Sequence, residues 1–520
     1  MWLLGGQSNA YLPLFKTMNA EAECAAAPHL PGVLRVATVG WEMHDAPQPE
    51  LLHPIDWQVM SAEAACRVSA VAFHFGSATL RSALATSLNN SSPTAPPTPI
   101  GVIVSAVDGT SLAFWTAKEG GSACDRACGP RDKSGQRYNA MISPLHRLPV
   151  AGVLWWQGES DTGCESYACV LAELIASWRE KWAAAAPDHV PLKGGAPSFP
   201  SAAVVASARH PHLLPFVVVQ LAPARAAFRG PLAGIEGTAW GEASTVAPIR
   251  AAQAAVADGQ VPCVGLASAV DQGDSGSPWW PGSIHGRHKK VVGARLAAEA
   301  ARLRATCGLR LGGGGGAFAG GGGAPRRTAS LAFLSPTAAD AADPAAARIT
   351  RGPRLASVIE LIEFPEYPGF GSLRALNSGR PQNSSLVWPY NSLWRLRFAG
   401  VGATGIVTTA FLPSSPAAFS ARFNGSSAAP ASPGGTKGGG RMVASVVEGS
   451  LAPDGFDLLV FDPSWEGAGA TSSFVVKLDA LWEDFPIAVV FNAEGYPMEP
   501  FSVDISRGRD GVGKWEAARS

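Results

Sequence analysis

The chain has 520 residues, 47% hydrophobic and 16% charged, a composition typical of a globular protein that is too long for one ordinary domain. Its 41 basic and 41 acidic residues cancel, so the composition argues against a nucleic acid or an anionic membrane as partner. No apolar run approaches the roughly 18 residues that predict a membrane span, and we expect a small, neutral or weakly charged substrate.

The first predicted element is a buried strand that opens the chain and ends in "GGQSNA", residues 5–10. Gly5 and Gly6 permit a sharp turn from strand to helix, which leaves Ser8 at the carboxyl end of the strand. Ligands bind at that edge of a parallel α/β sheet, so Ser8 is either a nucleophile or only the cap of the next helix. The chain starts inside this strand without a signal peptide, and we expect an incomplete N-terminus.

Strand-like and helix-like segments alternate from residue 1 to about residue 310. After the opening strand, continuous apolar runs predict strands at 100–107, 150–156, 214–222 and 263–270. Helical spacing of apolar residues predicts helices at 167–185, 247–257 and 288–305. This alternation predicts an α/β fold, a doubly wound parallel sheet with helices on both faces.

Low-complexity stretches interrupt the chain and mark linkers or surface insertions; they are 89–99, 193–203, 312–325 and 424–440. After about residue 326, short β-rich runs separated by Gly, Pro, Asn and Asp predict antiparallel strands at 392–398, 455–462, 473–482 and 487–492. We therefore expect a catalytic domain over 1–310, a Gly-rich linker over 311–325 and a smaller β-rich domain over 326–512.

The eight cysteines are even in number, and none lies in a CxxC pair with the spacing of a zinc site. Disulfides in an oxidising compartment are favoured, with buried free thiols as the alternative. N-glycosylation triplets occur at Asn89, Asn90, Asn383 and Asn424. These features favour a secreted protein or one in a lysosomal or other endomembrane lumen.

Three further predicted strands end in small or polar residues, giving "DGT" (108–110), "WWQGES" (155–160) and a segment in which His285 directly precedes a helix. A serine hydroxyl needs a nearby base, and a neutral imidazole suits that task. His285 is therefore the expected base for Ser8. The backbone N–H groups of Ser8 and Gly109 and the side-chain amide of Gln157 are candidate oxyanion-hole donors.

In these motifs the chain resembles the sialate O-acetylesterase family of SGNH-type hydrolases. That family's motifs read approximately GQSNM, GGT, WxQGES/T and IHPxxKxxVGxRLA. This chain has "GQSNA" (6–10), "DGT" (108–110), "WWQGES" (155–160) and "IHGRHKKVVGARLA" (284–297) in the same order. A weaker likeness continues into residues 480–501.

The resemblance implies a serine esterase without metal or organic cofactor that acts on O-acetylated sialic acids or related sugars, with Ser8 as nucleophile and His285 as base. The position three residues before the histidine is Gly282 rather than Asp, so the orienting acid stays open between Glu159 and Asp274, with Asp271 or a Ser-His dyad as further options. We also expect Gln7, Asn9 and Trp156 to bind substrate.

Asp108 and Gly286 depart from the family pattern, which keeps a catalytically impaired carbohydrate-binding protein as one alternative. An acetylesterase acting on acetylated polysaccharide is another. The sequence leaves the oligomeric state open.

Overall fold

The structure is a computed structural model, in which the chain forms two compact units. One unit is Met1–Thr350 with Glu483–Phe485 and Ser520, and the other is Arg351–Trp482 with Pro486–Arg519. The described residues are 1–89, 98–117, 124, 128–129, 133–185, 214–223, 246–274, 276–278, 284–312, 351, 496–499 and the C-terminal strands named below. The predicted linker lies outside them from residue 313 onward.

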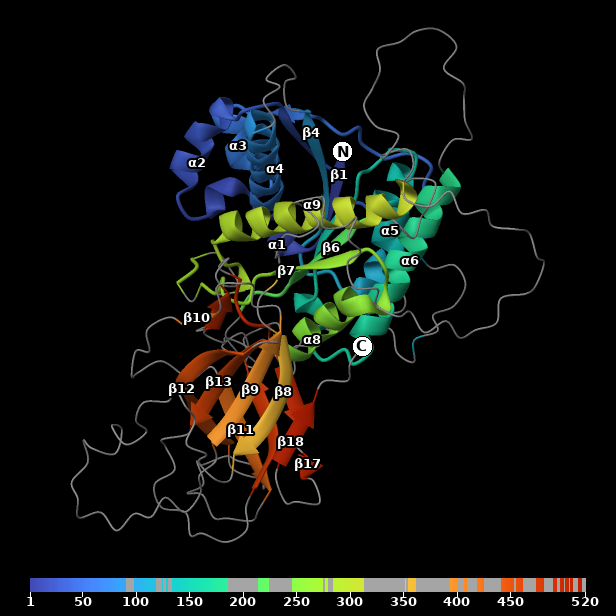
Figure 1. Cartoon of the computed structure of the whole chain (residues 1–520). Coiled ribbons are helices and arrows are strands. Elements are labelled where there is room, and N and C mark those ends of the chain that lie inside the picture. The colour runs from blue at the N-terminus through green and yellow to red at the C-terminus, as the bar shows by residue number, and fades with distance from the viewer. Residues whose placement is uncertain are drawn as a thin grey trace, which may run out of the picture. The chain divides into compact units, whose positions relative to one another are not determined.

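The first unit contains a seven-stranded sheet in the order β3-β2-β4-β1-β5-β6-β7 (Figure 1). The strands are β1 (Trp2–Gly6), β2 (Leu34–Thr38), β3 (Gln58–Val59), β4 (Ile100–Ala106), β5 (Val153–Trp156), β6 (Phe216–Gln220) and β7 (Val264–Ser268). All ladders are parallel except the one between β2 and the short edge strand β3. This confirms the predicted parallel sheet.

Strands β1, β5, β6 and β7 are buried at every residue, so both faces of the sheet are covered, as their continuous apolar sequences predict. The longer helices are α4 (Ala70–Asn89), α6 (Tyr167–Ala185), α8 (Ala247–Ala255) and α9 (Lys289–Gly312). Helix α4 contacts α9, and α6 contacts α8. The shorter helices are α1 (Ser8–Tyr11), α2 (Ala20–Ala26), α3 (Ala62–Arg67) and α5 (Gln136–Met141).

The second unit is built from antiparallel strands, as the β-rich sequence predicts. Nine of them form one sheet in the order β16-β14-β11-β12-β13-β9-β8-β18-β17, and β10 (Ile406–Thr408) pairs with β15 (Val490–Asn492). The bounds are β8 (Arg354–Leu361), β9 (Leu393–Ala399), β11 (Phe419–Asn424), β12 (Arg441–Ala452), β13 (Gly455–Phe461), β14 (Phe474–Ala480), β16 (Phe501–Asp504), β17 (Ser506–Arg507) and β18 (Gly513–Glu516).

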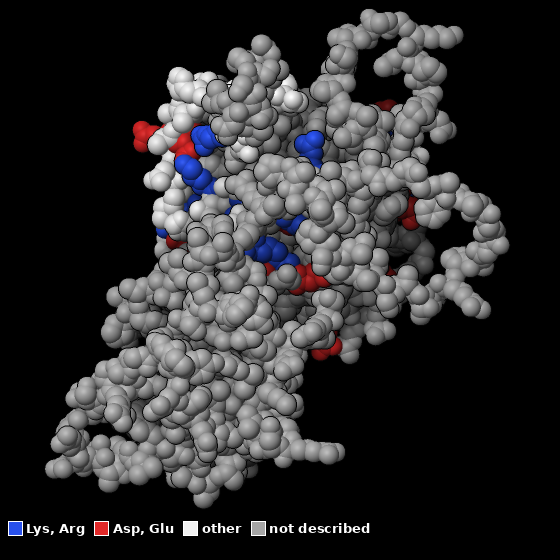
Figure 2. All heavy atoms as spheres, in the orientation of Figure 1, with Lys and Arg blue, Asp and Glu red and all other residues white. Residues whose placement is uncertain are grey.

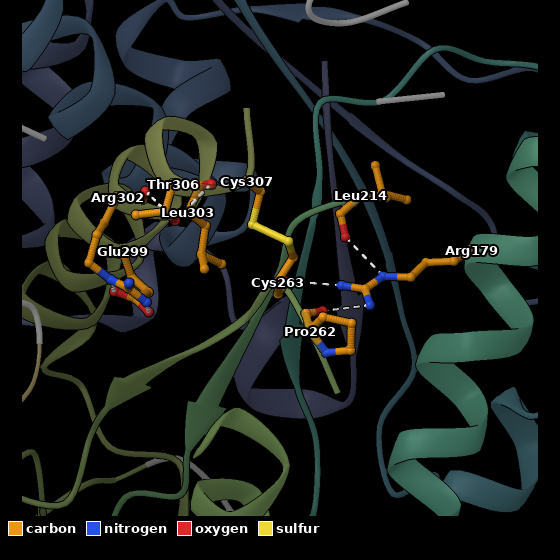
Figure 3. Close-up of a disulfide and its surroundings, with 9 residues drawn as sticks. All are labelled: Arg179, Leu214, Pro262, Cys263, Glu299, Arg302, Leu303, Thr306 and Cys307. Carbon is orange, nitrogen blue, oxygen red and sulfur yellow. Dashed lines mark hydrogen bonds and ion pairs between the residues drawn. A yellow bond between two sulfur atoms is a disulfide. The ribbon is translucent and has the colours of Figure 1, made fainter. Parts of the chain in front are cut away.

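All eight cysteines form disulfides, which confirms the preference for disulfides over free thiols. The pairs are Cys24–Cys66, Cys124–Cys169, Cys128–Cys164 and Cys263–Cys307. Figure 3 shows the last of these joining the start of β7 to α9. Beside it the buried guanidinium of Arg179, from α6, donates to the carbonyl oxygens of Leu214, Pro262 and Cys263. These links fix helices to the starts of β6 and β7.

On the described part of the face in Figure 2, both basic and acidic side chains occur, in keeping with a net charge of zero. None of the helices in the described part of the chain has the length and apolar character needed to cross a bilayer.

Candidate active site

The turn after β1 places Ser8 at the carboxyl end of a central strand. Gly6 has φ +135°, and a Cβ at this position would lie 2.0 Å from the carbonyl oxygen of Trp156, so only glycine fits here. The backbone N–H of Gln7 donates to the same carbonyl oxygen at 3.0 Å. Ser8 then opens α1 and is 8% exposed. Its N–H occupies the first helical position, which has no acceptor within the helix.

The turn after β4, which neighbours β1, contains Gly109. This glycine is exposed, has φ +66°, and has no heavy atom within 4 Å of where a Cβ would stand. The next residue, Thr110, anchors the turn: its hydroxyl donates to the carbonyl of Val107 at 2.8 Å and accepts from Trp115 Nε1 at 2.9 Å. The hydrogen bonds of Thr110 therefore fix this turn, while the space beside Gly109 is free of other heavy atoms.

The turn after β5, the other neighbour of β1, contains Gln157, which is fully buried. Its Nε2 donates to the carbonyl of Thr110 at 3.0 Å and also contacts Asp161 Oδ2. Gln7 Oε1 lies 3.3 Å from this nitrogen and 3.3 Å from the backbone N–H of Ser160. The amides of Gln7 and Gln157 thus join the turns that follow β1, β4 and β5.

Asn9, directly after Ser8, links two segments that are far away in the sequence. Its Nδ2 donates to Glu159 Oε1 at 2.6 Å and to the carbonyl of Ile284 at 2.9 Å, while its Oδ1 accepts from Lys289 Nζ at 2.5 Å. Trp156 Nε1 also donates to Glu159 Oε1, at 3.0 Å. The neighbour of Ser8 is therefore hydrogen-bonded to the neighbour of His285.

The loop containing His285 is held by its own contacts. Ser277 Oγ donates to the His285 carbonyl at 2.7 Å. The guanidinium of Arg287 forms a two-pronged ion pair with Asp274, at 2.6 and 2.9 Å, and the Arg287 N–H donates to the same carboxylate at 3.0 Å. A Cβ at Gly286 would lie 3.1 Å from the carbonyl oxygen of Gln272, so the small residue fits a close contact between these two segments.

Buried charged groups lie under the site. Burial raises the pKa of Glu159 and lowers that of Lys289 to about 7, and the attraction between the two groups opposes both shifts. The ammonium group of Lys289 also lies 4.2 Å from the centroid of the Trp156 ring. Burial raises the pKa of Asp161 to about 7, whereas the Arg287 guanidinium lowers that of Asp274. These carboxylates thus differ in environment and in the pH at which they ionise.

The structure brings most of the predicted residues to the carboxyl ends of the central strands. Ser8, Gly109, Gln157 and Glu159 follow adjacent strands, and Asn9 connects them to the loop of His285. The substrate-binding role expected for Gln7, Asn9 and Trp156 stays a prediction. All three side chains are at most 3% exposed, and their polar groups are bonded within the protein.

Sequence reasoning did not single out Lys289 or Asp161. Lys289 stands in the segment "IHGRHKK" at the position of the Lys in the motif IHPxxKxxVGxRLA, and that match was the available signal. Asp161 follows "WQGES" directly and is buried, and its Oδ2 accepts from the backbone N–H of Leu112 at 2.9 Å. Among the described residues, the candidate metal ligands Cys124, Cys169 and Glu173 cluster, but both thiols are consumed in a disulfide.

Comparison with known proteins finds a likeness to one family of carbohydrate esterases. Residues 1–191 match the model of a family described as "Carbohydrate esterase, sialic acid-specific acetylesterase". The sialate O-acetylesterase of Homo sapiens is 28% identical over 324 residues, and that of Rattus norvegicus is 30% identical over 175 residues. These segments cover 58% and 33% of this chain, and 53% and 27% of the human and rat proteins. The chain thus spans about half the length of the human relative.

A solved structure agrees with the fold. A carbohydrate acetylesterase from Xanthomonas citri aligns with a TM-score of 0.57 at 21% identity, covering 97% of this chain and 80% of that one. At this identity the likeness supports the architecture alone.

Proposed function

We propose that the chain, whose residues 1–191 match the model of sialic acid-specific carbohydrate acetylesterases, is a serine hydrolase that removes O-acetyl groups from sugars. The observation that carries this proposal is the bridge made by Asn9. It ties the turn of Ser8 to the carbonyl of Ile284, next to His285, across 275 positions of sequence. Acyl transfer by a serine needs a hydroxyl and a nearby base, and this bridge links the two segments that carry Ser8 and His285.

In the proposed reaction, His285 accepts the proton of Ser8 as its Oγ attacks the acetyl carbonyl. The tetrahedral oxyanion is stabilised by the N–H groups of Ser8 and Gly109. His285 returns the proton to the departing sugar hydroxyl, which leaves an acetyl-serine. His285 then takes a proton from a water molecule as that water attacks the ester, and it passes this proton to Ser8 Oγ as acetate is released.

Gln157 was expected to be a third oxyanion donor, and its contacts support a positioning role instead. Its Nε2 is bonded to Thr110 and Asp161, so it holds the Gly109 turn from behind. We assign similar positioning roles to the two candidate acids. Asp274 orders the residues directly after His285 through Arg287, and Glu159 fixes Asn9.

Sialic acids are the substrate that we propose, following the relatives named above. The disulfides support a secreted or lumenal location, because such bonds persist in oxidising compartments.

The direct test is acetate release from O-acetylated N-acetylneuraminic acid by the wild type and by Ser8→Ala. We expect the variant to lose at least about 10³-fold in kcat with an unchanged Tm, because the step that forms the acetyl-enzyme needs the hydroxyl. Unchanged turnover in Ser8→Ala would refute the assignment. Acetate release from acetylated polysaccharide alone would refute only the choice of sugar, and sugar binding without hydrolysis would favour the impaired homologue.

A further inference from the structure

An exposed aromatic pair lies beside the turn that contains Ser8. Trp41 is 47% exposed, and its ring packs edge-on against Tyr11, with centroids 5.3 Å apart and an interplanar angle of 64°. The other tryptophans whose burial is described are buried or half-buried. Tryptophan is enriched at binding interfaces because its apolar body carries a polar N–H, and this exposed one packs on Tyr11 of the helix that Ser8 opens.

The loop that holds Trp41 is fixed rather than loose. Some hydrogen bonds run from α5 to this loop and others from the loop to α5. Side chains of α5 donate from Arg137 Nη1 to Glu42 O (3.0 Å), from Asn139 Nδ2 to His44 O (3.0 Å) and from Gln136 Nε2 to Asp45 Oδ1 (2.8 Å). In the other direction, the loop N–H groups of His44 and Gln48 donate to the carbonyl oxygens of Gln136 (3.1 Å) and Asn139 (2.9 Å). The segment that directly follows Trp41 is therefore fixed, and the ring itself packs on Tyr11, which reduces the entropy lost when a ligand binds.

Two connections place this pair near Ser8, at the carboxyl ends of the sheet strands. Trp41 follows β2, and the backbone N–H of Val39 still donates to the carbonyl of Val104 on the parallel neighbour β4. Tyr11 stands three residues after Ser8 in α1, and residues at this spacing lie on the same face of a helix, with Cβ atoms roughly 5–6 Å apart. Tyr11, and the Trp41 ring packed on it, therefore lie beside the turn of the proposed nucleophile.

We propose that Trp41 and Tyr11 form a carbohydrate subsite that stacks against the apolar face of a pyranose ring in the acetylated substrate. Axial C–H groups of a pyranose form an apolar patch of the same width as an indole, and a rigid aromatic face suits them. In the same turn as Gly109, Asp108 is exposed, and its carboxyl group can accept hydrogen bonds from the ring's hydroxyls. This inference rests on the proposed function, because it assigns the sugar part of the same substrate.

The test compares Trp41→Ala and Trp41→Phe with Val59→Ala, a matched control at an exposed apolar residue on β3. Each is assayed on O-acetylated N-acetylneuraminic acid and on vinyl acetate, an ester without a ring. We expect Trp41→Ala to raise KM for the sugar ester roughly threefold to tenfold, with kcat and the rate on vinyl acetate unchanged. Trp41→Phe should retain most of the affinity, and Val59→Ala all of it.

An unchanged KM in Trp41→Ala, or an equal loss on both esters, would overturn the subsite. If the wild type hydrolyses neither ester, the proposed function fails, and the subsite is then judged by saturation-transfer NMR with the methyl glycoside of N-acetylneuraminic acid. Ring-proton signals that weaken in Trp41→Ala but not in Val59→Ala support the subsite, and signals of equal strength in both variants overturn it.

Discussion

Asn9 is the residue on which the geometry of the site depends. Both hydrogens of its amide group and its carbonyl oxygen are used, by Glu159, Ile284 and Lys289. Two of these partners are charged groups, and hydrogen bonds to charged groups are about twice as strong as neutral ones. A buried amide with every bond made holds one orientation, and this fixes the distance between the Ser8 turn and the His285 loop.

The buried pair of Glu159 and Lys289 gives a double-mutant prediction. Glu159→Gln and Lys289→Met each leave one charge buried without its partner, so each should lower the free energy of unfolding by about 3–5 kcal/mol. The double variant should lose clearly less than the sum of the two. Urea unfolding of the four proteins measures this, and additive losses would contradict the pairing.

Asp161 gives a prediction on pH. Its folded pKa of about 7 lies above its ordinary 3.8, so between these values the folded state binds more protons than the unfolded state. Stability should therefore fall as the pH rises through this window, by at most about 1.4 kcal/mol per pH unit, and stay level above it. Asp161→Asn removes the ionisation, so the Tm of the variant should change less between pH 4.5 and 7.5.

The matched control for this measurement is Asp56→Asn, at an exposed position. Its pH profile of Tm should follow that of the wild type. If the curves of Asp161→Asn and the wild type run parallel throughout the window, the buried, raised-pKa state of Asp161 is refuted.

At the scale of elements, the strands around the site could be predicted because their sequences are continuous apolar runs that end in glycine and polar residues. The predicted strand 100–107 corresponds to β4 (Ile100–Ala106), and the predicted helix 167–185 to α6. The sequence analysis missed α4, whose first turns are apolar on all sides and lack a clear helical period. It also missed β2, a short strand with two exposed positions.

The disulfide between Cys263 and Cys307 belongs to this scale because it joins β7 to α9. Replacing both cysteines with alanine frees a loop of 44 residues in the unfolded chain, and we expect a loss of about 2–4 kcal/mol in unfolding free energy. Thermal unfolding of the double variant measures this, with the equivalent Cys24 and Cys66 variant, of similar separation at 42, for comparison. An unchanged Tm would show that the bond contributes no stability.

At the scale of the whole molecule, the site depends on strand order, which the sequence does not specify. Residues 8, 109 and 157 meet because β4 and β5 flank β1, and local patterns cannot predict which strands are neighbours. The resemblance of four ordered motifs to a known family supplied that information indirectly. Side-chain partners such as Lys289 with Asn9 depend on tertiary packing and could be read only from the structure.

The central claim is that Ser8 is a nucleophile and that His285 is the general base that activates it. The most direct measurement is labelling of the intact protein with a serine-directed fluorophosphonate, followed by digestion and mass spectrometry of the labelled peptide. We predict that the label attaches to Ser8 in the wild type and that His285→Ala, still folded by circular dichroism, labels at least about 100-fold more slowly because its serine has lost its base. A label on another residue, or equally fast labelling in His285→Ala, would contradict the account.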